Sequence, residues 1–433
     1  MKLYSTKNKS KFVSLKEAIF KGLPEDNGLY MPESIPTLPS SFFQNLKNLS
    51  FQEIGTEVCK NLFKGALPDK DIRELIEASI TFPAPLVSLD EEKKVLELFH
   101  GPSLAFKDFG ARFMAQLMSY FNKEDKRELV ILVATSGDTG GAVAAGFHKT
   151  PGIKVVILYP SGKVSYLQEK QLTTLGHNIA ALEIDGTFDD CQSLVKQAFL
   201  DQDLNYKIRL SSANSINIAR LIPQSFYYFE AFKQLENKDQ KVVFSIPSGN
   251  FGNLTAGLFA KRMGLGIHQF IAATNVNDVV PEFLSTGLYN PRLSIRTLSN
   301  AMDVGNPSNF ERMMDLFGFT WNSLKKDIKG YAFTDEETKE GMKEVYAKHN
   351  YVIDPHGAVG YLALKEYQQE NKGTCGIILE TAHPAKFLDD VEEILEQKVG
   401  VPERLAALAN ETKIATKMTT HFDQFKNWLL SNY

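Results

Sequence analysis

KVVFSIPSGNFGN, residues 241–253, joins a short apolar run to a loop that contains two glycines. The run is nearly continuous in apolar residues, which is typical of a strand buried on both faces of a parallel sheet. The glycines permit unusual φ values and a close approach of a ligand to the backbone. The segment therefore predicts a strand end that can bind one phosphate group, with an ordinary tight turn as the alternative. The residues of this candidate phosphate loop are Gly249, Asn250, Phe251, Gly252 and Asn253.

Similar apolar runs recur along the chain, and helical patterns lie between them. This alternation predicts an α/β protein with mainly parallel sheets. Ligands in such folds bind beyond the C-terminal ends of the strands, so the loops that follow the strands are the places to look for a site. The further expected strands are 130–135, 154–159, 179–184, 270–274 and 376–380. The expected helices are 109–122, 187–201, 222–236, 335–349 and 383–398.

Size and composition exclude several classes of protein. The chain has 433 residues, of which 43% are hydrophobic, and a net charge of −4. It is too apolar for disorder and long enough for two or three domains, and it has no broad basic field for nucleic acid or anionic lipid. No apolar run reaches the roughly 20 residues of a membrane span. Cys59, Cys191 and Cys375 are few and distant, so we expect buried free thiols, no metal site and a cytoplasmic protein.

A second loop rich in small and hydroxylated residues, TSGDTGG at 135–141, follows the run 130–135. Such residues at the start of a helix expose N–H groups and hydroxyls that can bind an anion. A strand–helix turn capped by Asp138 or Thr139 is the alternative. This segment therefore supplies a second candidate anion site.

Three other segments carry side chains suited to chemistry. HGPSLAFKDF (100–109) places Lys107 among apolar residues, where desolvation would lower its pKa and make it a nucleophile, although most lysines only extend along the surface. NSINIAR (214–220) offers amides, hydroxyls and a guanidinium suited to phosphate, or else a turn before a solvated helix. LETAHPAKF (379–387) presents the Thr381 hydroxyl after a strand, and its histidine has no second histidine at zinc-ligand spacing.

These segments, in this order, resemble the fold-type II family of pyridoxal-phosphate (PLP) enzymes. In amino-acid sequence these segments are similar to the motifs of threonine synthases of the longer bacterial and fungal type. The matching segments are HGPSLAFKDFGARF, SGDTGGA, NSINIAR, PSGNFGNLTAG, SNAMDVGNPSNFER (299–312) and TAHPAKF, and the resemblance extends back to GLYMPE (28–33).

The resemblance implies roles for individual residues. Lys107 matches the Schiff-base lysine, which also acts as acid and base. The loop 249–253 matches the binding site of the PLP phosphate, and Thr381 matches the hydroxyl residue that faces the pyridine nitrogen. Asp138 matches a position near the cofactor O3′ that some relatives fill with asparagine, so the contact there is open. The residues that match substrate-binding positions are Thr135, Ser136, Thr139, Asn214, Ser215 and Arg220.

The resemblance also implies an architecture and a reaction. The fold would be tryptophan synthase β-like, with two open, mainly parallel sheets and the site between domains. We expect an N-terminal helical extension at 1–85, a large PLP-binding domain from 86–119 and 241–433, and a smaller mobile α/β domain at 120–240. The implied reaction turns O-phospho-L-homoserine and water into L-threonine and phosphate, in a protein that we expect to be a monomer rather than a dimer.

Two alternatives stay open at this point. Another fold-type II enzyme, such as a threonine dehydratase or a phospho-lyase acting on the same substrate, would share the lysine and the glycine loop. A catalytically inactive relative with a binding role would usually lack the lysine, which this chain has at position 107.

Overall fold

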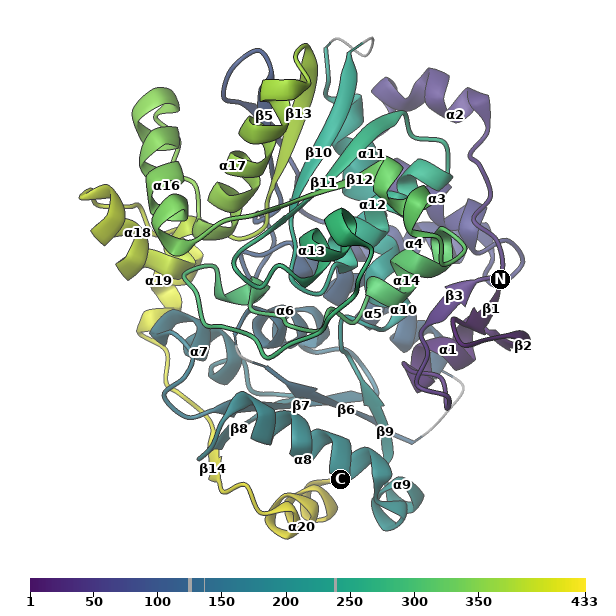
Figure 1. Cartoon of the computed structure of the whole chain (residues 1–433). Helices are drawn as coiled ribbons and strands as arrows, with labels where there is room; N and C mark the ends of the chain where they lie inside the picture. The colour runs from purple at the N-terminus through teal and green to yellow at the C-terminus, as the bar shows by residue number, and fades with distance from the viewer. Residues whose placement is uncertain (124–126, 136, 237–239) are drawn as a thin grey trace.

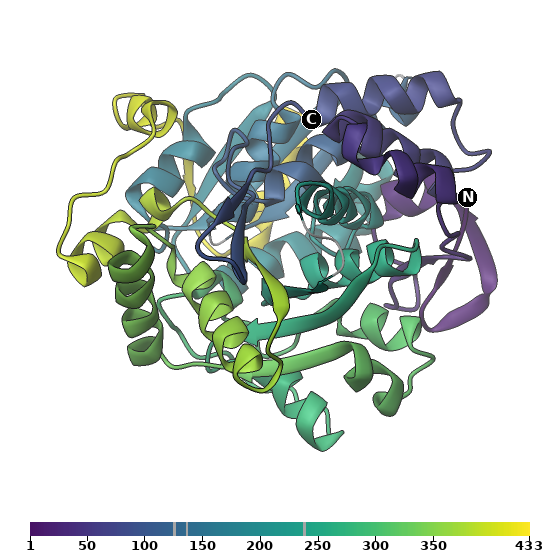
Figure 2. The same cartoon turned by 90° about the horizontal axis from the view of Figure 1, so that it is seen from above.

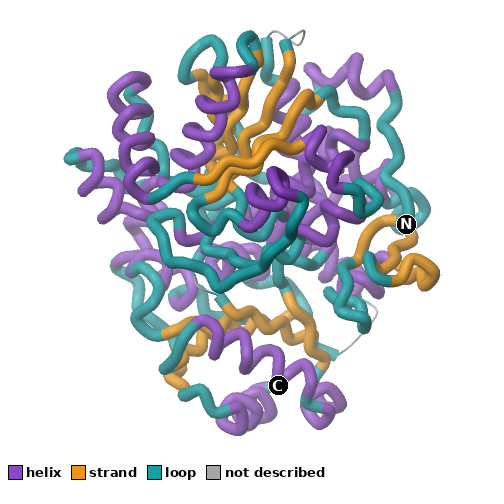
Figure 3. The backbone as a smooth tube through the Cα atoms, in the orientation of Figure 1, coloured by secondary structure: helices purple, strands orange, loops and turns teal. Residues whose placement is uncertain are grey.

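The computed structural model describes residues 1–433 except 124–126, 136 and 237–239. The described part of the chain contains two large, mainly parallel sheets and a small antiparallel sheet near the N-terminus. Figure 3 shows the strands of the two large sheets as separate groups, with helices packed between and around them. The predicted α/β class with two open, mainly parallel sheets is therefore confirmed.

The larger sheet has six strands in the order β12-β11-β10-β13-β5-β4. The opening segment 241–246 forms β10, which pairs in parallel with β11 on one side and β13 on the other. Only β4 runs antiparallel to its neighbour. Because β10 and β13 are parallel neighbours, the loops that follow them lie at the same edge of the sheet. The strands are β4 (Leu86–Ser88), β5 (Lys93–Glu97), β10 (Lys241–Pro247), β11 (Ile267–Thr274), β12 (Ile328–Ala332) and β13 (Thr374–Glu380).

The second sheet has five parallel strands in the order β14-β8-β7-β6-β9. One of its faces is covered by α8 and α20, whose buried side chains form a separate apolar cluster with the sheet. The helix expected at 187–201 is α8, and it makes this contact through Cys191, Leu194, Val195 and Ala198. The strands are β6 (Leu129–Ala134), β7 (Ile153–Pro160), β8 (Ile179–Ile184), β9 (Arg209–Ser212) and β14 (Thr416–Met418).

Helices fill the space between the sheets and cover their outer faces (Figure 1). Near the second sheet are α6 (Asp138–Phe147), α7 (Tyr166–Thr173), α8 (Phe188–Leu200), α9 (Gln202–Lys207) and α20 (Phe422–Asn432). The central helices are α5 (Lys107–Asn122), α10 (Ile218–Leu221), η2 (Ile222–Ser225), α11 (Phe226–Lys233) and α12 (Gly252–Arg262). The remaining elements of this part are α13 (Val279–Thr286), η3 (Asn300–Met302), α14 (Phe310–Leu316), α15 (Trp321–Asp327), α16 (Asp335–His349), α17 (Pro355–Glu370), η4 (Pro384–Phe387), α18 (Leu388–Leu395) and α19 (Glu403–Ala409).

The N-terminal region differs from the predicted helical extension, because it begins with a three-stranded antiparallel sheet. This sheet was missed because most side chains of its longest strand are exposed, so that the sequence shows no apolar run. In Figure 2 the purple N-terminal segment lies on the side opposite the yellow-green helices. Its elements are β1 (Lys2–Ser5), β2 (Asn8–Ser14), α1 (Leu15–Lys21), β3 (Tyr30–Pro32), α2 (Ser40–Asn45), η1 (Leu46–Asn48), α3 (Phe51–Leu62) and α4 (Asp69–Ser79).

Two expected domain boundaries also require correction. The C-terminal segment does not stay with the larger sheet: β14 pairs with β8, and Figure 1 shows the yellow segment descending to α20 beneath the second sheet. The segment 218–233 packs against α5 and α12 instead of staying with the second sheet. The reason is its continuous run of buried residues, Phe226 to Phe229, which needs apolar neighbours on several sides. The mobility of the smaller domain stays a prediction.

Among the described helices, none combines the length and the apolar composition that a membrane crossing requires. The three cysteines are free and buried, as predicted.

Candidate active site

The candidate phosphate loop lies between the end of β10 and the start of α12. Phe251 has φ 58°, in the left-handed region, and it immediately precedes the helix. Gly249 is closely packed, since a Cβ atom there would lie 2.7 Å from the Ala301 carbonyl oxygen. The Asn253 side chain donates from Nδ2 to the Pro247 carbonyl at 2.9 Å, which closes the loop. The sequence thus folds into a closely packed turn that presents its backbone at a helix N-terminus.

This turn has the properties of an anion cradle. A Cβ atom at Gly252 would meet only one atom within 4 Å, Asn309 Nδ2 at 3.5 Å, so the space above the helix start is open. The same Nδ2 is buried and has no hydrogen-bond partner in the described part of the chain. Backbone N–H groups at a helix start, together with the helix dipole, favour a phosphate. The residues present therefore fit the phosphate end of PLP.

Lys107 is brought to the same region by a short pairing between two loops. The Phe106 N–H donates to the Thr381 carbonyl at 2.9 Å, and Ala105 and Ala382 form an isolated antiparallel bridge. Thr381 is the first residue after β13, so the end of that strand positions the residue before the lysine. The structure thus brings together Lys107 and Thr381, which are distant in sequence.

The Lys107 amine lies in an electrostatic setting that suits a nucleophile and a base. Burial lowers its pKa, and the nearby cations of Arg220 and Lys386 lower it further, while Asp138 opposes them. A larger fraction of the amine is therefore neutral at a given pH than for a solvated lysine.

Asp138 is the first residue of α6 and forms a buried ion pair that the sequence analysis missed. Its Oδ1 lies 2.7 Å from Lys386 Nζ and accepts a hydrogen bond from Gln168 Nε2 at 3.1 Å. Although burial by itself would raise the pKa of Asp138, Lys386 and Lys107 together hold it well below its usual range. The carboxylate therefore stays ionised beside the candidate site.

Lys386 belongs to η4, and it joins the two parts of the molecule. The residue is buried, and its side chain donates to the Ser103 carbonyl at 2.7 Å and to Gln171 Oε1 at 3.2 Å. Gln171 lies on α7 beside the second sheet and also donates to the Ser103 carbonyl. The available sequence signal was the position of Lys386 in TAHPAKF, directly after a predicted strand.

The loop 135–141 is organised by Thr135. Its buried hydroxyl accepts from the N–H groups of Gly137 and Gly140 and donates to the Gly137 carbonyl. This hydroxyl therefore fixes the conformation of the loop, a structural role that the sequence analysis did not predict. Thr139 follows Asp138 in α6 and is partly exposed, whereas Ser136 lies outside the described residues.

The segment 214–220 ends at Arg220, which is close enough for its charge to lower the pKa of Lys107. Arg220 is 1% exposed, and burial lowers its pKa to about 10. Nη1 donates to the Ala213 carbonyl at 2.8 Å, while the buried Nε has no partner in the described part of the chain. Asn214 and Ser215 are partly exposed in the loop before α10. A buried guanidinium with spare donors is suited to an anionic ligand.

His383 has a structural role at the start of η4. Its Nδ1 accepts from the Ala385 N–H at 3.1 Å, which caps η4, and burial lowers its pKa to about 4. In the described residues, no group of three or more histidine, cysteine or acidic side chains could hold a metal ion.

Asp108, next to Lys107, should make stability depend on pH. It is fully buried, and burial raises its pKa to about 6, above the roughly 4 of an unfolded chain. The folded state therefore binds the proton of Asp108 more tightly than the unfolded state does. The contribution of this protonated carboxyl to the free energy of unfolding is fully present below pH 4 and is lost as the pH rises through 6. Relative to Asp108→Asn, the native protein should lose roughly 3 kcal/mol of unfolding free energy over this range. Urea titrations of both proteins between pH 4 and pH 7 test this. If the free energy of unfolding changed with pH in the same way in both proteins, the prediction would be wrong.

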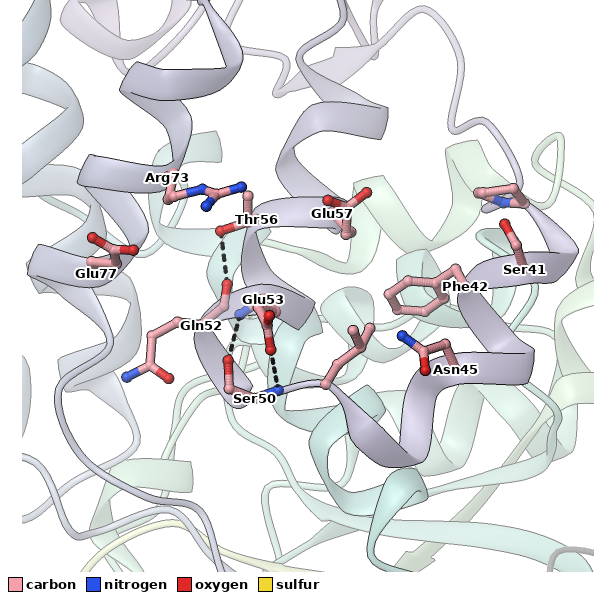
Figure 4. A pocket seen from close by; sticks show the side chains of 12 residues that line it. Ser41, Phe42, Asn45, Ser50, Gln52, Glu53, Thr56, Glu57, Arg73 and Glu77 are labelled. Atoms are coloured by element: carbon pink, nitrogen blue, oxygen red, sulfur yellow. Dashed lines mark hydrogen bonds between the residues drawn. The ribbon is translucent and has the colours of Figure 1, made fainter.

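A surface pocket of about 670 Å³ lies elsewhere, between α2, α3 and α4 (Figure 4). Ser50 and Glu53 in its wall form a capping box at the start of α3. None of the predicted site residues that the structure describes lines this pocket.

The fold, the buried amine of Lys107 and the candidate phosphate loop indicate one class of enzyme. Residues 82–379 match the family described as pyridoxal-phosphate dependent enzyme, and the chain is a fold-type II PLP enzyme. Two further matches narrow the class: residues 2–80 match the threonine synthase N terminus, and residues 357–428 match the C-terminal part of threonine synthase.

The chain belongs to the threonine synthase family. It is 46% identical to threonine synthase from Haemophilus influenzae, over 100% of both chains. The crystal structure of threonine synthase from Escherichia coli superposes with a TM-score of 0.92 at 43% identity, also over 100% of both chains. A PLP-bound threonine synthase from Brucella melitensis matches with a TM-score of 0.93 at 34% identity, over 99% of this chain and 98% of the other. The expected family, its activity and its cofactor are thereby confirmed.

Proposed function

We propose that the protein converts O-phospho-L-homoserine and water into L-threonine and phosphate. The observation that carries this proposal is the desolvated Lys107 amine, whose pKa the buried Arg220 cation lowers further. The loop 249–253, at the start of α12, and the Arg220 guanidinium are the two proposed anion-binding elements. A phosphorylated amino acid and a phosphorylated cofactor together require two such elements and one amine. When bound, PLP supplies the electron sink for removal of the substrate Cα proton.

Each part of the cofactor has a proposed partner in this chain. The backbone of residues 249–253 would hold its phosphate, and Lys107 would bind it covalently. The Thr381 hydroxyl would face the ring nitrogen; a hydroxyl, unlike a carboxylate, does not hold that nitrogen protonated. Asp138 would lie near O3′, held in place by Lys386.

Lys107 performs the proton transfers in this proposal. It takes a proton from the substrate Cα and then one from Cβ, and phosphate departs from Cγ. It returns a proton to Cγ, water adds its hydroxyl at Cβ and gives up a proton, and Lys107 finally returns a proton to Cα. A lowered amine pKa supports this work, because an acid–base group functions best when its pKa is near the working pH.

The substrate carboxylate and phosphate would bind in the region between α6 and α10. Their proposed partners are Thr135, Ser136, Thr139, Asn214, Ser215 and Arg220. The departing phosphate could stay near Arg220 and accept the proton of the attacking water. Closure of the second sheet and its helices over the site would exclude bulk water from these steps.

We also propose a monomer in the cytoplasm. The support for the compartment is that the three cysteines are free and buried, as is usual in a reducing environment.

The reaction is tested by incubating the purified holoenzyme with O-phospho-L-homoserine and separating the products. We expect L-threonine and inorganic phosphate in equal amounts. If 2-oxobutyrate were the main product, the protein would be a phospho-lyase or a threonine dehydratase of the same fold and the proposal would be wrong.

A further inference from the structure

Asn309 is a buried amide whose orientation is fixed by its neighbours. It is 0% exposed and lies directly before α14. Its Oδ1 accepts from Arg312 Nη1 at 2.8 Å, and its backbone N–H donates to the Asn250 carbonyl at 3.2 Å. Because an arginine can only donate, the atom facing Arg312 must be the amide oxygen. The NH₂ group therefore points the other way.

The NH₂ group faces the start of α12. Asn309 Nδ2 is the nearest atom to the position that a Cβ would take at Gly252, at 3.5 Å, and it has no hydrogen-bond partner in the described part of the chain. A buried donor without an acceptor is destabilising, so a protein usually supplies a partner for it. A helix of 11 residues begins at this point, and its N-terminus favours an anion.

Arg312 holds this arrangement in place. It is fully buried and donates to the carbonyls of Tyr30 and Ile216 as well as to Asn309. Three distant segments are thereby fixed around one side chain: the N-terminal sheet, the loop before α10, and the segment 299–312. Asn309 is thus prepositioned, and a ligand would not need to order it.

We propose that Asn309 is a binding residue for the PLP phosphate, with its Nδ2 donating to a phosphate oxygen at the start of α12. This inference rests on the proposed placement of the cofactor phosphate in the loop 249–253. It extends the phosphate site beyond the glycine loop to a side chain from a separate segment of the chain. Arg312 is the positioning residue for this contact.

Asn309→Asp is the sharpest test, because it keeps the shape and changes the charge. The aspartate would still accept from Arg312, so we expect the apoenzyme to unfold at the same temperature or higher. It would lose the donor and place a negative charge beside the phosphate. We expect the dissociation constant of PLP to rise about 10- to 100-fold, measured by removing PLP from the holoenzyme and titrating it back.

Pyridoxal lacks the phosphate, so comparing its affinity with that of PLP measures the contribution of the contact between Asn309 and the phosphate. If the proposal is right, Asn309→Asp binds PLP more weakly while its affinity for pyridoxal stays that of the native protein. Equal weakening for both ligands would show a general distortion and overturn the proposal, and so would unchanged affinity for both. If the native apoenzyme itself bound PLP no better than pyridoxal, the proposed phosphate site at 249–253 would be wrong, which is a separate result.

Asn178→Ala serves as the matched control. Asn178 is an asparagine beside the second sheet, where it donates to the carbonyls of Phe147 and Ile153. Its loss should lower the unfolding temperature without changing the affinity for PLP. A loss of affinity in this variant would mean that destabilisation alone weakens cofactor binding, and the result for Asn309 would then not support a contact.

Discussion

Replacing Lys107 with alanine is expected to lower kcat by about a thousandfold or more, because one side chain provides both cofactor attachment and the proton transfers. The visible absorption band of the covalently bound cofactor should disappear at the same time. The variant should still bind PLP, although more weakly, since the loop 249–253 is intact. Steady-state threonine formation and the absorption spectrum of the reconstituted variant measure the two effects.

Lys163→Ala is a suitable control, since Lys163 is an exposed lysine in the loop after β7. It should retain the native spectrum and rate. A Lys107→Ala protein that kept the visible band would show that another amine binds the cofactor. Of the described lysines, Lys386 is the buried amine whose charge acts on Lys107, and it would be the first to examine.

The second large effect is expected from Lys386→Met, which should lower the free energy of unfolding by about 3 to 5 kcal/mol. The side chains of Lys386 and Asp138 are 1% and 7% exposed, so the substitution leaves a buried carboxylate without its counter-ion. The pKa of Asp138 should rise, because burial then acts with less opposition. Urea unfolding at neutral pH measures the loss of stability.

The double variant Lys386→Met/Asp138→Asn separates charge from packing. Removing both charges should recover much of the lost stability, since the cost lies in the uncompensated carboxylate. Lys398→Met, which removes an exposed lysine that pairs with Glu392, should be close to native in its free energy of unfolding. If the single and double variants were equally unstable, the lost contacts to Ser103 and Gln171 would be the cause instead of the charge.

This ion pair also bears on how the two sheets are held together. Lys386 follows the larger sheet, whereas Asp138 starts the helix that follows β6 of the second sheet. Because the pair lies beside Lys107, a movement of one sheet relative to the other would change the electrostatic setting of the amine. Closure of the site and the reactivity of Lys107 are therefore expected to be linked.

The main strands and helices could be predicted from local pattern. A strand buried on both faces needs a continuous apolar run, so 130–135 and 241–246 were recognised as β6 and β10. Strand β2 could not be recognised, because most of its side chains are exposed and its pairing uses backbone groups. Strand β14 is short and partly exposed, and only its pairing with β8 makes it a strand.

For the site, the sequence by itself determined the residue types that suit the chemistry and the loops that carry them: Lys107, the glycine loop 249–253 and Thr381. The glycine loop and Thr381 follow apolar runs, and small, hydroxylated and glycine residues in that position leave a local signature. The role of Lys107 came from the resemblance of the six segments to a known family, because its own segment favoured an ordinary surface lysine. Only the tertiary structure decided that Asp138 pairs with Lys386 and that Asn309 faces Gly252. These contacts join distant segments, and local periodicity reports which face of an element is buried but not which distant side chain it meets.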